Sequence, residues 1–316
     1  MRTFAAYLAS CRSLMGLDAT TPMWSTPALS SSAHTQVGAS SIQQHRSILA
    51  AQLSFWQDTL NRSRIAMATL GANKPREDHT WFPYEPTWSC PVDELIGTYG
   101  DGVKWVCGIR DIAPPCIVYS AGSGGSAQFE RSVLAQTACE VHIFDPTAKA
   151  GDTPDNQKRL HFHAIGFGAR DGSSELRNGL HGRFELARLD TIMRRLNHTF
   201  LDVLKMDIEG YEGDMVDQFA EMGRAAPVPI GQLLIEVHAN RIRGGPRSNA
   251  RAKLFQSLQK SDFHVFHKEV NALHTSACEY AWTRVAPRCV QVAHGTPPQY
   301  VAVSYPWAKL LPLSCD

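Results

Sequence analysis

The sequence has few acidic residues at its start and no long apolar segment. Its first 57 residues contain one acid, Asp18, together with Arg2, Arg12, Arg46 and many serines. This composition is typical of organelle transit peptides, and equally of disordered serine-rich extensions. No apolar run approaches the ~20 residues that span a membrane, so we predict no transmembrane segment. Residues 1–40 are therefore predicted to be a disordered or targeting extension.

The cysteine spacing and the net charge argue against a disulfide-rich protein and against a nucleic-acid-binding protein. The eight cysteines include no CxxC pair and no zinc-like spacing, which favours free thiols in a reducing compartment over a disulfide framework. The default prediction is thus a soluble cytoplasmic protein, with organelle import left open. Lysine and arginine total 31 against 30 acids, a net charge of +1. Because there is no global basic field, we predict no specific nucleic-acid partner.

What the sequence does contain is a series of short apolar runs that end in glycine or acidic residues. They read CIVYSAGSGG at 116–125, VHIFDP at 141–146 and VLKMDIEGYE at 203–212. Such runs are typical of parallel strands covered on both faces, and ligands bind at the carboxyl ends of these strands.

The remaining apolar runs also alternate with predicted helices. Further strands are predicted at 161–165 and 232–238, and helices at 128–136, 189–197, 211–220 and 251–260. This alternation predicts a doubly wound, Rossmann-like α/β fold. The last two runs, HVFHKEV and YAWTRV, are separated by too short a link for a helical crossover, so they should pair antiparallel at one edge.

A segment before this core, 41–104, is predicted to be helical at first and then rich in Trp, Pro and Gly. Apolar residues recur at helical spacing between Ile42 and Leu70, which predicts a helix packed on the fold or, alternatively, a substrate lid. The aromatic residues after Trp81 could line a substrate pocket or simply cover the sheet. The main domain is predicted to span 105–316.

The glycine-rich loop after the first run is a candidate nucleotide site. Gly122, Ser123 and Gly124 allow a tight turn whose backbone amides can approach a ligand. Asp145 follows Gly122 by 23 positions, close to the roughly 20 expected for an acid that accepts hydrogen bonds from ribose hydroxyls.

Four polar residues at predicted strand tips are candidates for catalysis: Asp207, Glu209, Glu236 and His238. Asp207 is interpreted as positioning cofactor or substrate, with helix capping as the alternative. His238 is the best general base by residue type, because imidazole titrates near neutrality. Lys205, Asp207 and Glu209 should share one strand face. The four tips could also hold magnesium, but no compact ligand motif is present and we predict no metal.

Lys205 and a basic loop each allow two interpretations. Lys205 interrupts an apolar run, as either a base with a depressed pKa or a partner in a structural ion pair. The basic loop could grip an anionic acceptor or carry solvated charge. It contains Arg241, Arg243, Arg247, Arg251 and Lys253.

Several segments of the sequence together resemble the class I S-adenosylmethionine-dependent methyltransferases. They are YSAGSGG, the acid in IFDP, LDTIMRR through LKMDIEGYE, LLIEVH, FHKEVN and CEYAW. The LKMDIEGYE block is similar to the FkbM-like branch, and KWVCGI, LLIEVH and CEYAW to the methyltransferase-like protein 24 group within or near it. The resemblance covers about residues 105–285. It implies a seven-stranded sheet whose last strand is antiparallel. Ser123 inside the loop departs from the pattern and leaves the amide contacts open.

The resemblance implies that S-adenosyl-L-methionine binds at Gly122, Ser123, Gly124, Asp145 and Asp207. It further implies an O-methyltransferase acting on an unidentified small molecule or glycan, with Asp207, His238 and Glu209 as catalytic residues; this acceptor class rests on analogy. An NAD-dependent oxidoreductase fits the glycine loop and its acid as well. A cofactor-binding module without turnover is the third hypothesis.

Overall fold

The computed structural model describes residues 81, 83–97, 102–148, 158–175, 183–225, 228–239, 250–271, 274–290 and 299–310. The predictions for 1–40, for the helix at 42–70 and for Arg241, Arg243 and Arg247 lie outside these residues. Among the helices described, none is long and apolar enough to cross a membrane.

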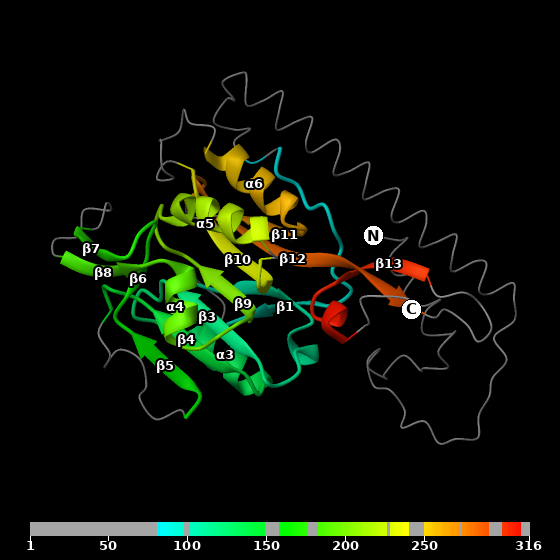
Figure 1. Cartoon of the computed structure of the whole chain (residues 1–316), viewed down its shortest axis with the longest axis horizontal. Helices are drawn as coiled ribbons and strands as arrows, with labels where there is room; N and C mark the ends of the chain where they lie inside the picture. The colour runs from blue at the N-terminus through cyan, green and yellow to red at the C-terminus, as the bar shows by residue number, and fades with distance from the viewer. Residues whose placement is uncertain are drawn as a thin grey trace, which may run out of the picture. The chain divides into compact units, whose positions relative to one another are not determined.

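The centre of the fold is a mostly parallel sheet with strand order β11-β12-β10-β9-β3-β4-β5 (Figure 1). Its strands are β3 (Ile117–Ala121), β4 (Glu140–Phe144), β5 (Leu160–His163), β9 (Leu201–Met206), β10 (Ile230–His238), β11 (Phe263–Val270) and β12 (Ala277–Val290). β12 lies between β10 and β11 and is antiparallel to both. The predicted antiparallel pair is therefore confirmed, as is the doubly wound α/β class.

Several short strands were not predicted. β13 (Gln299–Ser304) pairs with the second half of β12 and adds an eighth strand. β1 (Asp93–Ile96) and β2 (Lys104–Cys107) form an antiparallel pair. A small separate sheet contains β6 (Gly166–Phe167), β8 (Arg183–Ala187) and β7 (Gly172–Glu175). Two 3-10 turns, η2 (Ile109–Asp111) and η4 (Trp307–Leu310), complete the described elements.

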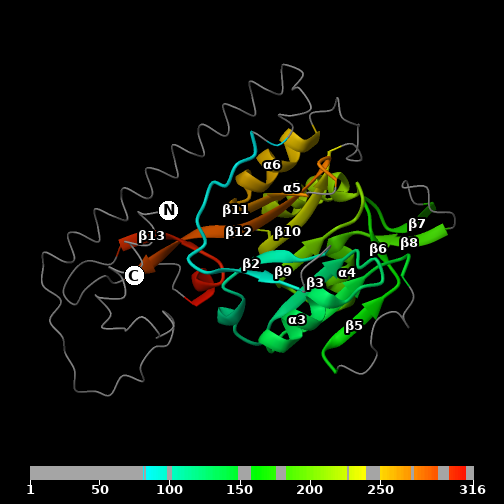
Figure 2. The same ribbon diagram turned by 180° about the vertical axis from the view of Figure 1, so that it is seen from behind.

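Both faces of the sheet are covered because successive side chains point to opposite sides. Tyr119 and Leu204 belong to the core under α4 (Leu189–Arg195), α5 (Glu212–Ala225) and α6 (Ala250–Lys260). Val118 and Val203 belong to the core under α3 (Gln128–Gln136) and the β1–β2 pair. Figure 1 shows α5 beside α6, and Figure 2 shows the fold from behind. Each of the four α-helices in the described residues occupies a segment predicted to be helical.

Trp81 and Tyr84, two of the described aromatic residues before the core, pack over the sheet and do not line the cavity described below. The Tyr84 ring lies 4.3 Å from that of Phe255, and the Trp81 ring lies 6.1 Å from that of Tyr280. Arg251, one of the predicted basic-loop residues, places its guanidinium 5.2 Å from the centre of the Trp81 ring. Arg251 lies in α6 rather than in a loop, and it packs on an aromatic ring, so neither alternative given for the loop describes it.

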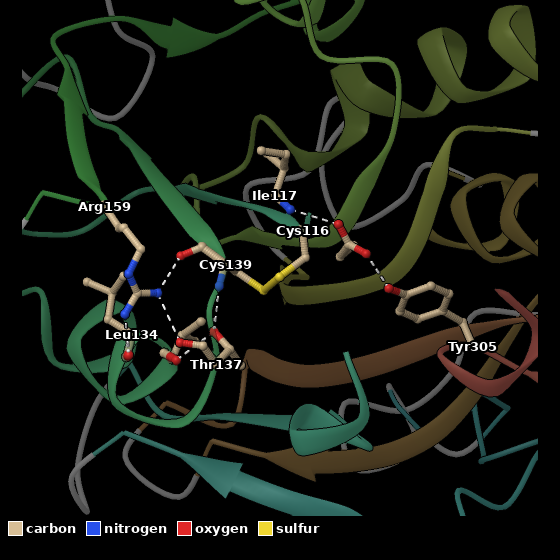
Figure 3. The surroundings of a disulfide bond; sticks show 9 residues. Cys116, Ile117, Leu134, Thr137, Cys139, Arg159 and Tyr305 are labelled. Carbon is tan, nitrogen blue, oxygen red and sulfur yellow. Dashed lines mark hydrogen bonds between the residues drawn. A yellow bond between two sulfur atoms is a disulfide. The ribbon is translucent and has the colours of Figure 1, made fainter. Parts of the chain in front are cut away.

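Two disulfides contradict the prediction of free thiols in a reducing compartment. Cys90 pairs with Cys107, and Cys116 pairs with Cys139 (Figure 3). Cys116 and Cys139 directly precede two adjacent parallel strands, β3 and β4, so the fold brings them together although 23 positions separate them. Sequence spacing alone gave no sign of this pairing. Because disulfides persist in oxidising compartments, the argument for a cytoplasmic location also falls.

Polar anchors surround the second disulfide (Figure 3). The Arg159 guanidinium donates to the carbonyls of Leu134, Thr137 and Cys139 at 2.8–2.9 Å. The buried Asp202 carboxylate accepts from the Ile117 amide at 2.7 Å and from the Tyr305 hydroxyl. The amino ends of β3, β4 and β9 are thus held by covalent and hydrogen bonds.

Candidate functional site

A cavity of about 550 Å³ lies at the carboxyl ends of β3, β4 and β9. This volume is within the usual range for small-molecule sites. Part of its wall is apolar, formed by Phe144, Pro146, Phe167 and Leu186. The rest is polar and includes Gly122, Ser123, Gly124, Glu130, Asp145, Lys205, Asp207, Glu209 and Glu236. Every predicted cofactor-binding residue therefore lines the same cavity.

Gly122 is required by the contact between two strand tips. Its φ is +79°, and a Cβ atom there would lie 1.8 Å from the carbonyl oxygen of Asp207. Its amide donates to the Phe144 carbonyl at 3.0 Å. Because only glycine fits this approach, the loop can connect the ends of β3, β4 and β9 at the cavity floor.

Asp145 holds the glycine loop. Its Oδ2 accepts from the Ser123 amide and hydroxyl, each at 2.8 Å, and from the Gly124 amide at 3.1 Å. Its Oδ1 accepts from the amide and hydroxyl of Thr147 and from the Ala148 amide. Burial would raise the pKa of Asp145, but the hydrogen bonds from Thr147 and Ser123 keep it below its ordinary value. Ribose binding by Asp145 stays a prediction.

Asp207 and Glu279 share a buried cation, Lys104. The Lys104 ammonium lies 3.4 Å from Asp207 Oδ2 and 2.5 Å from Glu279 Oε1, and its side chain is 2% exposed. Burial acts to lower the pKa of Lys104, but the charges of Glu279 and Asp207 outweigh it and raise this pKa. For Asp207, burial acts to raise the pKa, while the positive charges of Lys104 and Lys205 lower it to about 2. Asp207 is thus a carboxylate at neutral pH.

His238 lies among three carboxylates, which decides its charge. Its Nδ1 is 3.2 Å from Glu212 Oε1, and its Nε2 is 3.4 Å from Glu209 Oε2 and 3.3 Å from Glu236 Oε2. Burial acts to lower the pKa of His238, but the hydrogen bond and charge of Glu212 and the charge of Glu236 raise it to about 9. At neutral pH His238 is therefore an imidazolium and must lose a proton before it can act as a base.

Glu236 has the opposite character to Asp207. Burial, followed by the charge and hydrogen bond of Asp207, raises the pKa of Glu236 to about 8. The Asn271 amide also donates to Glu236 at 3.1 Å. The pair thus consists of one ionised and one protonated carboxyl group, joined by a hydrogen bond.

The predicted convergence of Asp207, Glu209, Glu236 and His238 is confirmed, with one correction. β9 ends at Met206, and Glu209 lies in a turn at φ 56°. Lys205, Asp207 and Glu209 therefore do not share a strand face, although all three line the cavity. The glycine at 210, with its own positive φ, completes the turn that ends the alternation.

Lys205 forms a structural contact: its ammonium donates to the Gly122 carbonyl at 2.6 Å. Three site residues were not predicted, namely the buried Lys104 and Glu130 and the partly buried Glu279. Lys104 and Glu279 could have been found as charges beside or within the apolar runs KWVC and CEYAW, since buried charges need partners. Glu130 in the first turn of α3 accepts from the Ser120 hydroxyl, while its second oxygen is buried without a hydrogen-bond partner.

Groups of carboxylates and imidazole that lie partly in the cavity and partly beside it have metal-like spacing. Asp207, Glu209 and His238 form one group, and Asp207, Glu236 and Glu279 form another. Lys104 already supplies a positive charge between Asp207 and Glu279. A metal ion bound by the second group would have to displace this ammonium, and the absence of a metal from the reaction stays a prediction.

The cavity fits S-adenosylmethionine in three respects. The apolar wall suits a flat base, and the glycine loop leaves no room for a Cβ atom at its closest approach. The unpartnered Glu130 oxygen offers an acceptor for an ammonium group. With a strand order that places antiparallel β12 between β10 and β11, this fold and site define a class I S-adenosylmethionine-dependent methyltransferase.

Residues 52–284 match a protein family described as "Methyltransferase domain". The chain belongs to this family. It is 28% identical over 158 residues to the human "Probable methyltransferase-like protein 24", covering 48% of this chain and 42% of the relative. The rat protein of that name is 27% identical over 225 residues, covering 69% of this chain and 58% of the relative. The chain thus spans about half the length of these relatives.

Solved structures give a more distant likeness. A fibrillarin pre-rRNA processing protein of Methanococcus jannaschii has 11% identity and a TM-score of 0.34, covering 54% of this chain and 66% of that protein. The assignment above therefore rests on the family match and on the strand order and cavity of the chain itself.

Proposed function

We propose that the chain transfers a methyl group from S-adenosylmethionine to an oxygen atom of a small molecule or glycan. The observation that carries this proposal is the group of acids and His238 at the strand tips, beside the cavity formed at the Gly122 loop. We assign the activity to the domain predicted at 105–316, with 41–104 as its helical and pre-core segment.

The cofactor would be held by groups that differ in chemistry along the cavity. The amides of the 122–124 loop and Glu130 would hold the amino-acid part, and the apolar wall with Phe144 and Phe167 would pack against the base. Asp145 would accept from ribose hydroxyls if part of its bonding to the loop is exchanged. S-adenosylmethionine supplies a methyl group activated by a sulfonium, so the main task of the protein is alignment.

A hydroxyl acceptor fits the polar half of the cavity. Asp207 and Glu209 present carboxylate oxygens, which accept hydrogen bonds from hydroxyl groups and can orient several of them at once. We propose that Asp207 positions the acceptor or cofactor and that Glu209, on its strained turn, contacts the acceptor at the rim.

His238 is proposed as the general base, but its neighbours limit the fraction of it that is deprotonated. Glu212 keeps it protonated at neutral pH, where Glu236 is itself protonated, so only the small deprotonated fraction can take a proton from an acceptor hydroxyl. Deprotonation of His238 at higher pH would increase that fraction. If His238 is the base, the rate of methyl transfer should therefore rise with pH.

Methyl transfer against a panel of metabolites and glycans tests the proposal, with S-adenosylhomocysteine release as the readout. Product formed on a hydroxyl acceptor would support it. Transfer only to nitrogen or sulfur acceptors would contradict the oxygen assignment while leaving the methyltransferase assignment intact. Cofactor binding without transfer to any acceptor would favour the binding-module hypothesis, and hydride exchange with NAD would favour an oxidoreductase.

A further inference from the structure

A second group of titratable side chains lies outside the cavity. We call it the histidine cluster, and it consists of Glu140, His142, His161, His163 and His198. None of these five residues lines the cavity described above. The cluster lies on the face of the sheet where Tyr119 and Phe144 pack under α4.

The strand register brings these residues together. His142 on β4 is the direct partner of His161 on the edge strand β5, and their rings stack 4.6 Å apart. Glu140, two positions before His142, points its carboxylate to the same side. Its Oε2 lies 3.8 Å from the Nε2 atoms of both His142 and His161.

Two of the imidazole nitrogens are left without a hydrogen bond. The Nε2 atoms of His142 and His161 are both buried and have no hydrogen-bond partner. His142 is only 5% exposed. Buried polar atoms are normally paired, so two orphan nitrogens that both approach one carboxylate oxygen call for a shared partner.

The other nitrogen of His142 indicates what that partner is. His142 Nδ1 and His163 Nε2 lie 3.0 Å apart and share one hydrogen bond. If Nδ1 of His142 donates, its Nε2 carries a free lone pair. This is the arrangement of a metal-binding histidine, whose second nitrogen is fixed by a hydrogen bond.

We propose that Glu140, His142 and His161 bind a divalent transition-metal ion of the zinc type. Ligand atoms ~2.1 Å from a tetrahedral zinc ion lie about 3.4 Å apart, and the two Glu140 distances of 3.8 Å are close to this value. Two imidazoles and one carboxylate suit zinc, whereas magnesium and calcium prefer oxygen ligands.

The site is open on one side. The side chains of Glu140 and His161 are 53% and 40% exposed, while that of His142 is 6% exposed. The ion can therefore enter from solvent, and water can complete its coordination.

The expected consequence is structural. The ion would link β4 to β5, which is an edge strand among those described, and would add a bond where the sheet has few. A bound ion that does not bind the unfolded chain stabilises the fold by mass action.

The test uses full-length, tag-free protein stripped with a chelator and titrated with Zn²⁺ alone. Calorimetry gives stoichiometry and affinity, melting curves give the stabilisation, and Co²⁺ absorption reports the coordination geometry. The variants are His161→Ala and Glu140→Gln, which change half-exposed side chains and leave the buried His142 intact. His274→Ala replaces an exposed histidine outside the cluster as the matched control, and His238→Asn tests the cavity.

We expect one zinc ion per chain, a rise in Tm and a four-coordinate Co²⁺ spectrum. His161→Ala and Glu140→Gln should each weaken zinc binding by at least the roughly 10-fold to 100-fold seen when only a supporting residue is lost. His274→Ala and His238→Asn should bind as the wild type does. No binding by the wild type would overturn the proposal. So would binding that is lost in His238→Asn but kept in both cluster variants, because the ion would then belong to the cavity.

Discussion

The two ends of the parallel strands differ in how their polar groups are bonded. At the amino ends, the Cys116–Cys139 disulfide, Arg159 and Asp202 connect β3, β4 and β9 to their surroundings. At the carboxyl ends, Asp207, Glu236 and His238 crowd around an open cavity, and nearby oxygens of Glu130 and Glu212 have no hydrogen-bond partner. The polar groups at the amino ends are bonded within the protein, whereas those at the carboxyl ends can still bond to a ligand. We call these the closed end and the open end.

This difference shows how the fold can hold a strained, charged site. Several acids lie together at the open end, which costs stability because like charges repel and buried charges lose hydration. Covalent and hydrogen bonds at the closed end keep the strands aligned despite that cost. Substitutions at the open end should therefore alter methyl transfer or ligand binding, while substitutions at the closed end should alter the stability of the fold.

The largest expected effect is on the rate of methyl transfer. His238→Asn and Asp207→Asn should each lower single-turnover transfer by about 10²–10⁴, the usual contribution of a general base. Affinity for S-adenosylhomocysteine should change much less. Glu185→Gln, at an exposed ion pair with Arg195, is the matched control and should leave the rate unchanged. Full activity in both site variants would refute the roles given to these residues.

At the closed end, removal of the Cys116–Cys139 disulfide should destabilise the fold. Replacing both cysteines by serine opens a loop of 23 positions, which should cost about 3 kcal/mol of unfolding free energy. Denaturant unfolding with and without reductant measures this. Reductant should destabilise the wild type more than the double variant, in which only Cys90–Cys107 is left to reduce. Equal sensitivity of the two proteins would contradict the role of this disulfide.

Asp145 should affect both ligand binding and stability, because it binds the glycine loop and faces the cavity. Asp145→Ala should weaken S-adenosylhomocysteine binding by about 1.5–3 kcal/mol for each charge-assisted hydrogen bond to the ligand. It should also destabilise the fold, since Ser123 and Thr147 lose their acceptor. Calorimetry on the folded variant separates the effects, and an unchanged affinity would leave Asp145 with the loop role alone.

The smallest predicted effect is a pH dependence. Because the pKa of His238 is raised to about 9, transfer should increase with pH up to about 9 and then level off. His238→Asn should lose this rise. The same shift stabilises the fold at pH below the ordinary histidine pKa of about 6.5, and this stabilisation should disappear as pH rises through 9. A flat rate profile for the wild type would exclude His238 as the base.

Elements with a clear period could be predicted from the sequence. The helix at Gln128–Gln136 matches its predicted bounds, and the runs at Cys116, Val141, Val203 and Gln232 all contain strands. Each is an apolar segment ended by glycine or acid, so local pattern and tertiary burial agree. The cavity residues were predictable for the same reason, since parallel strands end on one side of the sheet.

What could not be predicted depends on contacts between distant segments. Cys116 meets Cys139 only because β3 and β4 are adjacent, and Lys104 meets Asp207 across 103 positions. The charge of His238 depends chiefly on Glu212, which comes from α5 and lies 26 positions away. A sequence pattern reports which residues lie at strand ends, but the pKa of each depends on the neighbours that the fold supplies.

The central claim, that the cavity binds S-adenosylmethionine, is tested most directly by melting curves with S-adenosylhomocysteine and with NAD. At about one hundred times its dissociation constant, a ligand that binds only the folded chain stabilises it by roughly 2.7 kcal/mol. We predict a rise in Tm with S-adenosylhomocysteine and none with NAD. A rise with NAD and none with S-adenosylhomocysteine would contradict the account.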